Sequence, residues 1–219
     1  MGLIILDGAG GVNKANVDAD GHLNVNVRPP AFGALGYYRQ AVVSGTLTAS
    51  LGTGLFWSCR WTDATRLCLI QSIRVNAITV TSNSVIAVQF NLNVLRSYTA
   101  TDTGGTAVGV PASMQKMRSS MGSSLMGDWR MPTTGLLTAG TRTPDTNPIG
   151  MVVGTSSATV GTTWFGAGAP QPIYSRDNVD HHPIILAQNE GLAITNPATS
   201  PTGTWTFLVQ MEWGEVAAY

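Results

Sequence analysis

The sequence contains few charged residues. Only 11% of its 219 residues are charged, and 12 basic residues balance 12 acidic ones, so the formal net charge is +0. An average soluble domain is about 25% charged. Disordered chains combine few apolar residues with a strong net charge, whereas 43% of this chain is apolar, so disorder is excluded. Because no basic excess can neutralise phosphates and no charged heptads flank an apolar seam, nucleic-acid partners and coiled coils are excluded as well.

Long hydrophobic runs are also missing. Uninterrupted apolar runs such as residues 3–6 and 184–187 are far shorter than the ~20 residues that span a bilayer, so no membrane partner is expected. The amino terminus has no basic segment before its short apolar stretch, and Leu6 stands where a myristoylation motif needs Ser or Thr. The sequence therefore predicts a globular protein that is made in the cytoplasm.

Residues that carry chemistry are few and scattered. The two cysteines, Cys59 and Cys68, are expected to be buried free thiols, although a hairpin loop over 62–65 would let them face each other. His181 and His182 lie near two aspartates, but adjacent residues of an extended segment point to opposite sides, so we predict a polar loop and no metal site. No Gly-x-Ser-x-Gly motif surrounds a serine, and we expect neither a cofactor nor an enzyme.

The first 36 residues differ from the rest of the chain. An apolar tetrad (Leu3, Ile4, Ile5 and Leu6) is followed by glycines, a turn signal at 18–21 and one short alternating segment at 22–27. A single short strand cannot bury its own apolar side. We therefore predict that residues 1–36 form an extended arm, and that the tetrad is an assembly contact on this chain or a neighbour.

From residue 37 onward the pattern is that of β-strands. Strands are expected over 37–48, 55–61, 66–80, 85–98, 183–187, 192–196 and a final segment from 204 to 213. Only 113–123 has helical spacing, and Gly191 is expected to supply a positive φ in the turn that begins at Gln188. Strands without βαβ alternation predict an all-β sandwich over 37–219, with jelly-roll connections through the long loops 99–112 and 132–147, and at most one short helix.

Aromatic side chains offer one possible binding surface. Trp57, Trp61, Trp205 and Trp213 alternate with core positions and are expected to be buried. Trp129 and Trp164 lie nearer to loops, so they are the candidates for stacking on a glycan or contacting a receptor.

The basic residues are mostly arginine, which suggests that other chains cover much of the surface. The chain has 10 Arg but only 2 Lys, together with 26 Thr and 25 Gly. Interfaces that remain buried lose Lys above all, whereas Arg and aromatic residues persist. The composition therefore predicts a subunit whose surface is largely covered by other chains.

Two segments carry a resemblance to a known class of proteins. Residues 96–106 (RSYTATDTGGT) and 182–196 (HPIILAQNEGLAITN), with Gly203-Thr204-Trp205 and Glu212-Trp213, resemble structural proteins of tailed bacteriophages. The resemblance covers about residues 90–215 and includes no catalytic motif. It implies a jelly-roll subunit in a virion, trimeric assembly, and partners such as the major capsid protein.

These observations lead to one main hypothesis and two alternatives. The main hypothesis is a non-enzymatic capsid decoration or cement protein that stabilises the particle through its arm and its charge-poor surfaces. The first alternative is a tail or fibre component that binds a receptor or glycan through Trp129 and Trp164. The second is an enzyme, which would need a cleft that brings acids or His181 and His182 within bonding distance of each other.

Overall fold

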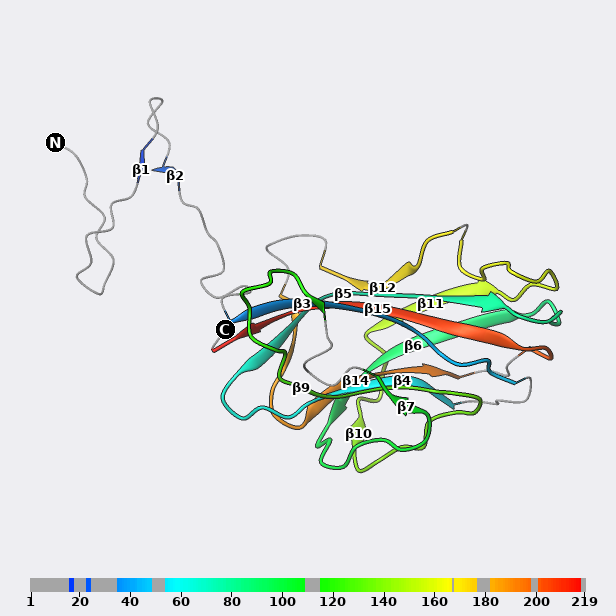
Figure 1. Ribbon diagram of the computed structural model, residues 1–219, viewed down its shortest axis with the longest axis horizontal. Coiled ribbons are helices and arrows are strands. Elements are labelled where there is room, and N and C mark those ends of the chain that lie inside the picture. Colours follow the sequence, from blue (N-terminus) through cyan, green and yellow to red (C-terminus); the bar gives the residue numbers. More distant parts are fainter. Residues whose placement is uncertain are drawn as a thin grey trace. The chain divides into compact units, whose positions relative to one another are not determined.

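A computed structural model describes most of the chain (Figure 1). The described residues are 35–48, 54–108, 115–166, 168–176, 182–197 and 201–217, together with the paired strands β1 (Asn16–Val17) and β2 (Leu23–Asn24). The chain divides into two compact units, Met1–Pro30 and Ala31–Tyr219. The first unit includes the β1–β2 pair, whose strands flank the turn expected at 18–21.

The larger unit is a β-sandwich of two antiparallel sheets packed against each other (Figure 1). One sheet has seven strands among the described residues, with β10, β6, β14, β4, β9 and β7 in this order and β11 paired with β6. Their bounds are β4 Gly54–Trp61, β6 Ala87–Arg96, β7 Thr106–Ala107, β9 Met126–Met131, β10 Thr143–Pro144, β11 Gly150–Thr155 and β14 Glu190–Asn196.

The second sheet has six strands among the described residues, in the order β12, β5, β15, β3 and β8, with β13 paired with β5. Their bounds are β3 Gly36–Val43, β5 Leu67–Thr79, β8 Gln115–Lys116, β12 Gln171–Ser175, β13 Ile184–Leu186 and β15 Trp205–Val216. The predicted all-β sandwich is confirmed, whereas the jelly-roll connectivity stays a prediction. No helix long and apolar enough to cross a membrane occurs in the described part of the chain.

Alternation along the longest strands creates the core. Val88, Phe90, Leu92 and Val94 of β6 are buried, as their period of two predicts. On β15 every second residue from Trp205 to Trp213 is likewise buried. These two rows belong to different sheets and meet inside the sandwich, so they supply much of its hydrophobic core.

A bulge in β4 adds to this core. Trp57 is paired with Ile194 and Leu55 with Thr195, so Phe56 is an extra residue in the ladder. Phe56 and Trp57 are therefore both fully buried in the main core, although they are neighbours in sequence. The ring centroid of Phe56 lies 5.2 Å from that of Trp205 in the opposite sheet, which ties the two layers together.

Two local features differ from the simplest interpretation of the sequence. Residues 115–123, whose spacing fits a helix, contain β8 and turns and no helix, which agrees with the expectation of at most one short helix. The methionines of this segment have helical spacing by coincidence, because residues 115–116 pair with Tyr38 and Arg39 of β3 and form an edge strand. In the turn before β14 the positive φ belongs to Asn189, at 61°, and Gly191 lies in the strand. Asn tolerates this left-handed conformation because its side chain bonds locally.

Two long loops, which include the segments 99–108 and 132–147, cover part of the outer face of the seven-stranded sheet (Figure 1). They contain β7 and β10, and they contact each other through a bridge between Thr103 and Thr138. A second bridge joins Leu137 to Leu55 of β4. Beneath the loops lies a separate small hydrophobic cluster of Leu55, Leu95, Tyr98, Leu137 and Ala193. We call this cluster the outer core.

Candidate functional site: a loop-covered face with a buried ion pair

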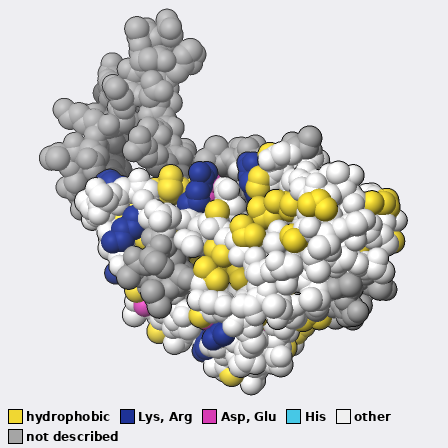
Figure 2. All heavy atoms as spheres, turned by 45° about the vertical axis from the view of Figure 1, so that its right-hand side comes forward, with side chains coloured by type: hydrophobic (Ala, Val, Ile, Leu, Met, Phe, Trp, Pro, Cys, Tyr) yellow, Lys and Arg dark blue, Asp and Glu magenta, His cyan; other side chains and the backbone are white. Residues whose placement is uncertain are grey.

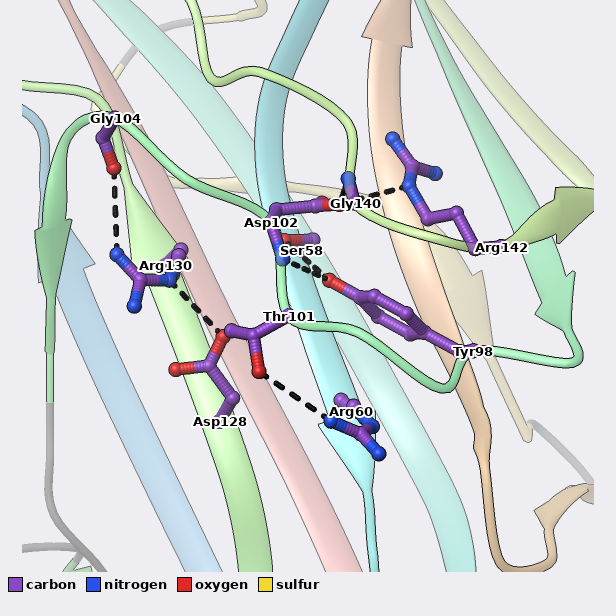
Figure 3. Close-up of polar contacts among 10 residues, drawn as sticks. All are labelled: Ser58, Arg60, Tyr98, Thr101, Asp102, Gly104, Asp128, Arg130, Gly140 and Arg142. Atoms are coloured by element: carbon purple, nitrogen blue, oxygen red, sulfur yellow. Dashed lines mark hydrogen bonds and ion pairs between the residues drawn. The ribbon is translucent and has the colours of Figure 1, made fainter.

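The outer core is closed by Tyr98, whose ring lies between two arginines (Figure 3). The guanidinium carbons of Arg60 and Arg142 lie 5.7 and 5.8 Å from the ring centroid, within the range of cation–π contacts. Gly191 makes room for this ring, because a Cβ there would lie 2.8 Å from Tyr98 Cδ1. Burial is the main cause that raises the pKa of the Tyr98 phenol, so this hydroxyl stays neutral and polar contacts hold it in place.

A buried ion pair fastens the two covering loops to each other. Asp102 is fully buried, and its Oδ1 accepts hydrogen bonds from Arg142 Nε at 2.9 Å and from Gly140 N at 2.7 Å. The Asp102 N–H donates to the Tyr98 hydroxyl at 3.2 Å. The Arg142 side chain is only 8% exposed. Asp102 therefore joins the 99–108 segment, the 132–142 segment and the outer core in one network (Figure 3).

A small hollow lies beside this network on the outer face of β6 and β14. Its volume is about 170 Å³, and Leu95, Ala139, Pro144 and Ala193 form its apolar walls. Arg142, Asn93 and Thr195 provide its polar atoms. The Thr195 hydroxyl donates to Asn93 Oδ1, and Asn93 Nδ2 donates to the carbonyl of Asp145. Among the described residues Arg142 uses Nε for its one hydrogen bond, so the two terminal nitrogens of its guanidinium can bind a further acceptor.

A second buried carboxylate lies inside the main sandwich. Glu215 is fully buried and lies two residues after Trp213, on the same inward-facing side of β15. Its Oε1 accepts hydrogen bonds from the Ser124 hydroxyl at 2.7 Å and from Leu125 N at 2.9 Å. Burial raises the pKa of this carboxyl above its ordinary value, and the two hydrogen bonds oppose that shift. Glu215 thus holds the 122–125 segment against the sandwich.

The two cysteines also belong to the core. Cys59 and Cys68 are both buried free thiols, as expected. Burial raises the pKa of each thiol. A thiolate is the reactive form of cysteine, so neither side chain is an activated nucleophile.

An exposed apolar surface follows β11. Its residues alternate between half-buried and exposed, and the side chains of Met151 and Val153 are 55% and 61% exposed. Ile149, just before the strand, is 43% exposed, and Val160 beyond it is 63% exposed. Met151 and Val153 are paired with Asn91 and Gln89 of β6, so the side chains next to them on the sheet are uncharged. Figure 2 shows hydrophobic side chains gathered among mostly uncharged ones on one face of the molecule.

The carboxylates of the described residues form hydrogen bonds or ion pairs within the chain. Every Asp and Glu of the described residues accepts at least one intrachain hydrogen bond. Five also pair with an arginine: Asp102 with Arg142, Asp128 with Arg130, Asp145 and Glu190 with Arg96, and Glu212 with Arg39. Most carboxylates of the described residues are therefore paired with an arginine of the same chain.

The structure corrects the prediction of an aromatic binding surface. Trp129 is only 1% exposed and Trp164 only 4%. Trp129 lies on β9 and packs against Trp57 and Trp213, with ring centroids 5.1 and 5.9 Å away. Trp164 Nε1 donates to the Thr79 hydroxyl. Neighbouring Gly residues make both segments look like loops in sequence, whereas the two rings fill the core.

Other predicted site residues lie outside the described part of the chain. This is the case for Leu3, Ile4, Ile5 and Leu6 of the arm, and for His181. His182 is described, and its Nδ1 lies 2.8 Å from the carbonyl oxygen of Pro183. Within the described ranges, no three His, Cys, Asp or Glu side chains form a group that could hold a metal ion.

The Asp102–Arg142 network and the hollow were not found by sequence reasoning. The two residues are 40 positions apart in loops, and no periodic pattern marks them. Comparison with known proteins gives no relative to guide the assignment, because no family model and no curated protein matches this chain.

Proposed function

We propose that this chain is a non-enzymatic structural subunit of a tailed-bacteriophage virion, and that it acts as a capsid decoration or cement protein. In this proposal it assembles as a homotrimer in the host cytoplasm, and it binds the major capsid protein in the virion. It needs no cofactor. The arm of residues 1–36 and the charge-poor faces of the sandwich supply the contacts.

The observation that carries this proposal is the apolar outer strand β11. Met151 and Val153 expose more than half of their side chains next to uncharged neighbours. Exposed apolar patches with polar rims are typical of protein–protein contact sites. Because the carboxylates of the described residues are engaged within the chain, such a contact would desolvate few free charges.

The architecture also suits a structural role. Aromatic contacts across the sandwich, and loops held by a buried ion pair, produce a body with little room to rearrange. A subunit that stabilises a particle adds binding energy through many identical contacts, and each contact is favoured by rigid faces. The resemblance of residues 96–106 and 182–196 to phage structural proteins supplies the setting.

Binding to preformed capsids that lack the subunit tests the proposal. The full chain should co-sediment with capsids, and deletion of residues 1–12 should weaken that binding at least tenfold. A chain with Leu3, Ile4, Ile5 and Leu6 present but with the polar residues Asn13, Lys14 and Asn16 replaced by serine serves as the control and should bind like the unaltered chain. If the full chain does not bind capsids, the decoration role is wrong; if the truncated chain binds equally well, the arm makes no contact.

A further inference from the structure

The hollow beside Arg142 is of the right size and polarity for a short apolar segment. We propose that it is the docking site for residues 3–7 of the arm of a neighbouring copy. One apolar side chain of the tetrad fills the hollow, and Asp7 binds the free guanidinium nitrogens of Arg142. This inference rests on the proposed function, because it names the receptor for the arm contact.

The size of the hollow matches one side chain. It measures about 170 Å³. Apolar protein cavities of roughly 150 Å³ accommodate one benzene molecule, which is comparable to a Leu or Ile side chain. Its walls are the aliphatic side chains of Leu95, Ala139, Pro144 and Ala193, and such walls favour an aliphatic occupant over a polar one. The arm presents four aliphatic residues in succession.

The charges are complementary. The tetrad is followed directly by Asp7, so the segment is Leu-Ile-Ile-Leu-Asp. Arg142 lines the hollow, Arg60 lies on the other side of Tyr98, and Asp102 pairs only with Arg142. Arg142 makes its hydrogen bond to Asp102 through Nε, so its terminal nitrogens suit a second carboxylate. A basic residue in place of Asp7 would face like charge there.

The position of the hollow favours an arm from a neighbour. The arm joins the sandwich at Gly36, where β3 begins in the six-stranded sheet. The hollow opens on the outer face of β6 and β14, which belong to the seven-stranded sheet on the opposite side of the sandwich. In this proposal a neighbour supplies the arm, so each occupied hollow would join one copy of the chain to the next.

A labelled peptide of residues 1–12 tests the docking site. The receptor is the full chain with Leu3, Ile4, Ile5 and Leu6 replaced by serine, so that its own arm does not compete. Two exposed wall residues permit blocking variants, Ala139→Trp and Pro144→Trp. Ala158→Trp is the matched control, because Ala158 is exposed in the loop after β11, at the other end of β6. Circular dichroism and the melting temperature show that each variant is folded.

Fluorescence anisotropy measures how tightly each receptor variant binds the labelled peptide. Each blocking variant should weaken peptide binding at least tenfold, and Ala158→Trp should change it less than twofold. An Asp7→Lys peptide should also bind at least tenfold more weakly. If both blocking variants bind the peptide normally, or if the unblocked receptor does not bind it, the docking site is wrong. The assembly function would survive that result if deletion of residues 1–12 still weakens capsid binding at least tenfold.

Mixing two defective chains identifies the source of the arm. One chain carries the serine-substituted arm with an open hollow, and the other carries an intact arm with Ala139→Trp. If neighbours exchange arms, the mixture should form heteromeric complexes in analytical ultracentrifugation, while neither chain self-associates through this contact. If the mixture forms none although the intact chain assembles, the neighbour is not the source of the arm.

Discussion

At the scale of single residues, two buried carboxylates differ in the groups that stabilise their negative charge. Asp102 is paired with Arg142 beneath the loops, whereas Glu215 has only hydroxyl and backbone donors at its Oε1. Removing one partner of a buried ion pair leaves the other charge uncompensated. Glu215 has no ion pair among the described residues, and burial, the largest cause, raises its pKa despite the charge of Arg66, so that the protonated form is favoured. The two residues should therefore respond to mutation and to pH in different ways.

Asp102→Ala should lower the free energy of unfolding by about 3–5 kcal/mol, because it leaves the Arg142 guanidinium buried without its carboxylate. Urea denaturation measures this loss. Asp145→Ala is the matched control, because it breaks an arginine–carboxylate pair in which both side chains are more than one third exposed. That exposed pair should contribute less than about 1 kcal/mol. Equal losses for the two variants would show that the buried pair has no special role.

Glu215→Gln should remove a pH dependence of stability. Because the pKa of Glu215 is raised in the folded state, the native protein binds more protons than the unfolded chain, and stability falls as pH rises from the ordinary glutamate value through the raised one. Glutamine keeps the acceptor for Ser124 and Leu125 without the buried charge. The melting temperature of the variant relative to the native chain should thus increase by several degrees between pH 4 and pH 8. A difference that does not change with pH would contradict the assignment.

At the scale of elements, sequence patterns predict a strand well when one of its faces is buried and the other is polar. β6 and β15 were located because one face of each is buried and the other is polar over most of its length. β11 was missed, because its outward side chains are apolar and Gly150 and Gly154 interrupt it. The bulge at Phe56 and the network around Asp102 depend on partners distant in the chain, so no local pattern encodes them.

β11 can lie against the segment that follows it only because Gly154 has no side chain. A Cβ at this position would lie 2.5 Å from the carbonyl oxygen of Trp164. Gly154→Ala should therefore destabilise the protein by about 1–3 kcal/mol, since overpacking forces the backbone to shift. Gly135→Ala is the control, because nothing lies within 4 Å of a Cβ there. Thermal unfolding compares the two variants, and equal melting temperatures would show that β11 moves away without loss.

At the scale of the whole molecule, most carboxylates are paired within the chain, while apolar side chains are exposed on one strand. The ion pairs of the described residues satisfy carboxylates within the chain, while Met151 and Val153 remain exposed. Association through such a surface depends on the burial of apolar area and little on ionic strength. Paired carboxylates together with exposed apolar side chains fit a protein contact surface better than a surface that attracts a charged ligand.

The double variant Met151→Glu with Val153→Glu should prevent self-association through β11. Both side chains are exposed, so the fold should remain intact, while burial of two new carboxylates in a contact would be unfavourable. Sedimentation velocity should show lower mass for the variant at a concentration where the native chain associates, and added salt should not dissociate the native complex. Thr155→Glu, at another exposed position of β11, controls for added charge at its end. An unchanged mass for the double variant would exclude β11 as a contact.

The pairing of β3 with β15 also determines when the protein can be completed during synthesis. β3 is the first strand of the sandwich and β15 the last, yet Val43 is paired with Leu208 and Tyr37 with Gly214. The six-stranded sheet can therefore close only after Trp205–Val216 has left the ribosome. Pairings this distant in sequence make folding slow and leave strands exposed meanwhile. The nascent chain therefore depends on the speed with which β15 becomes available to pair with β3.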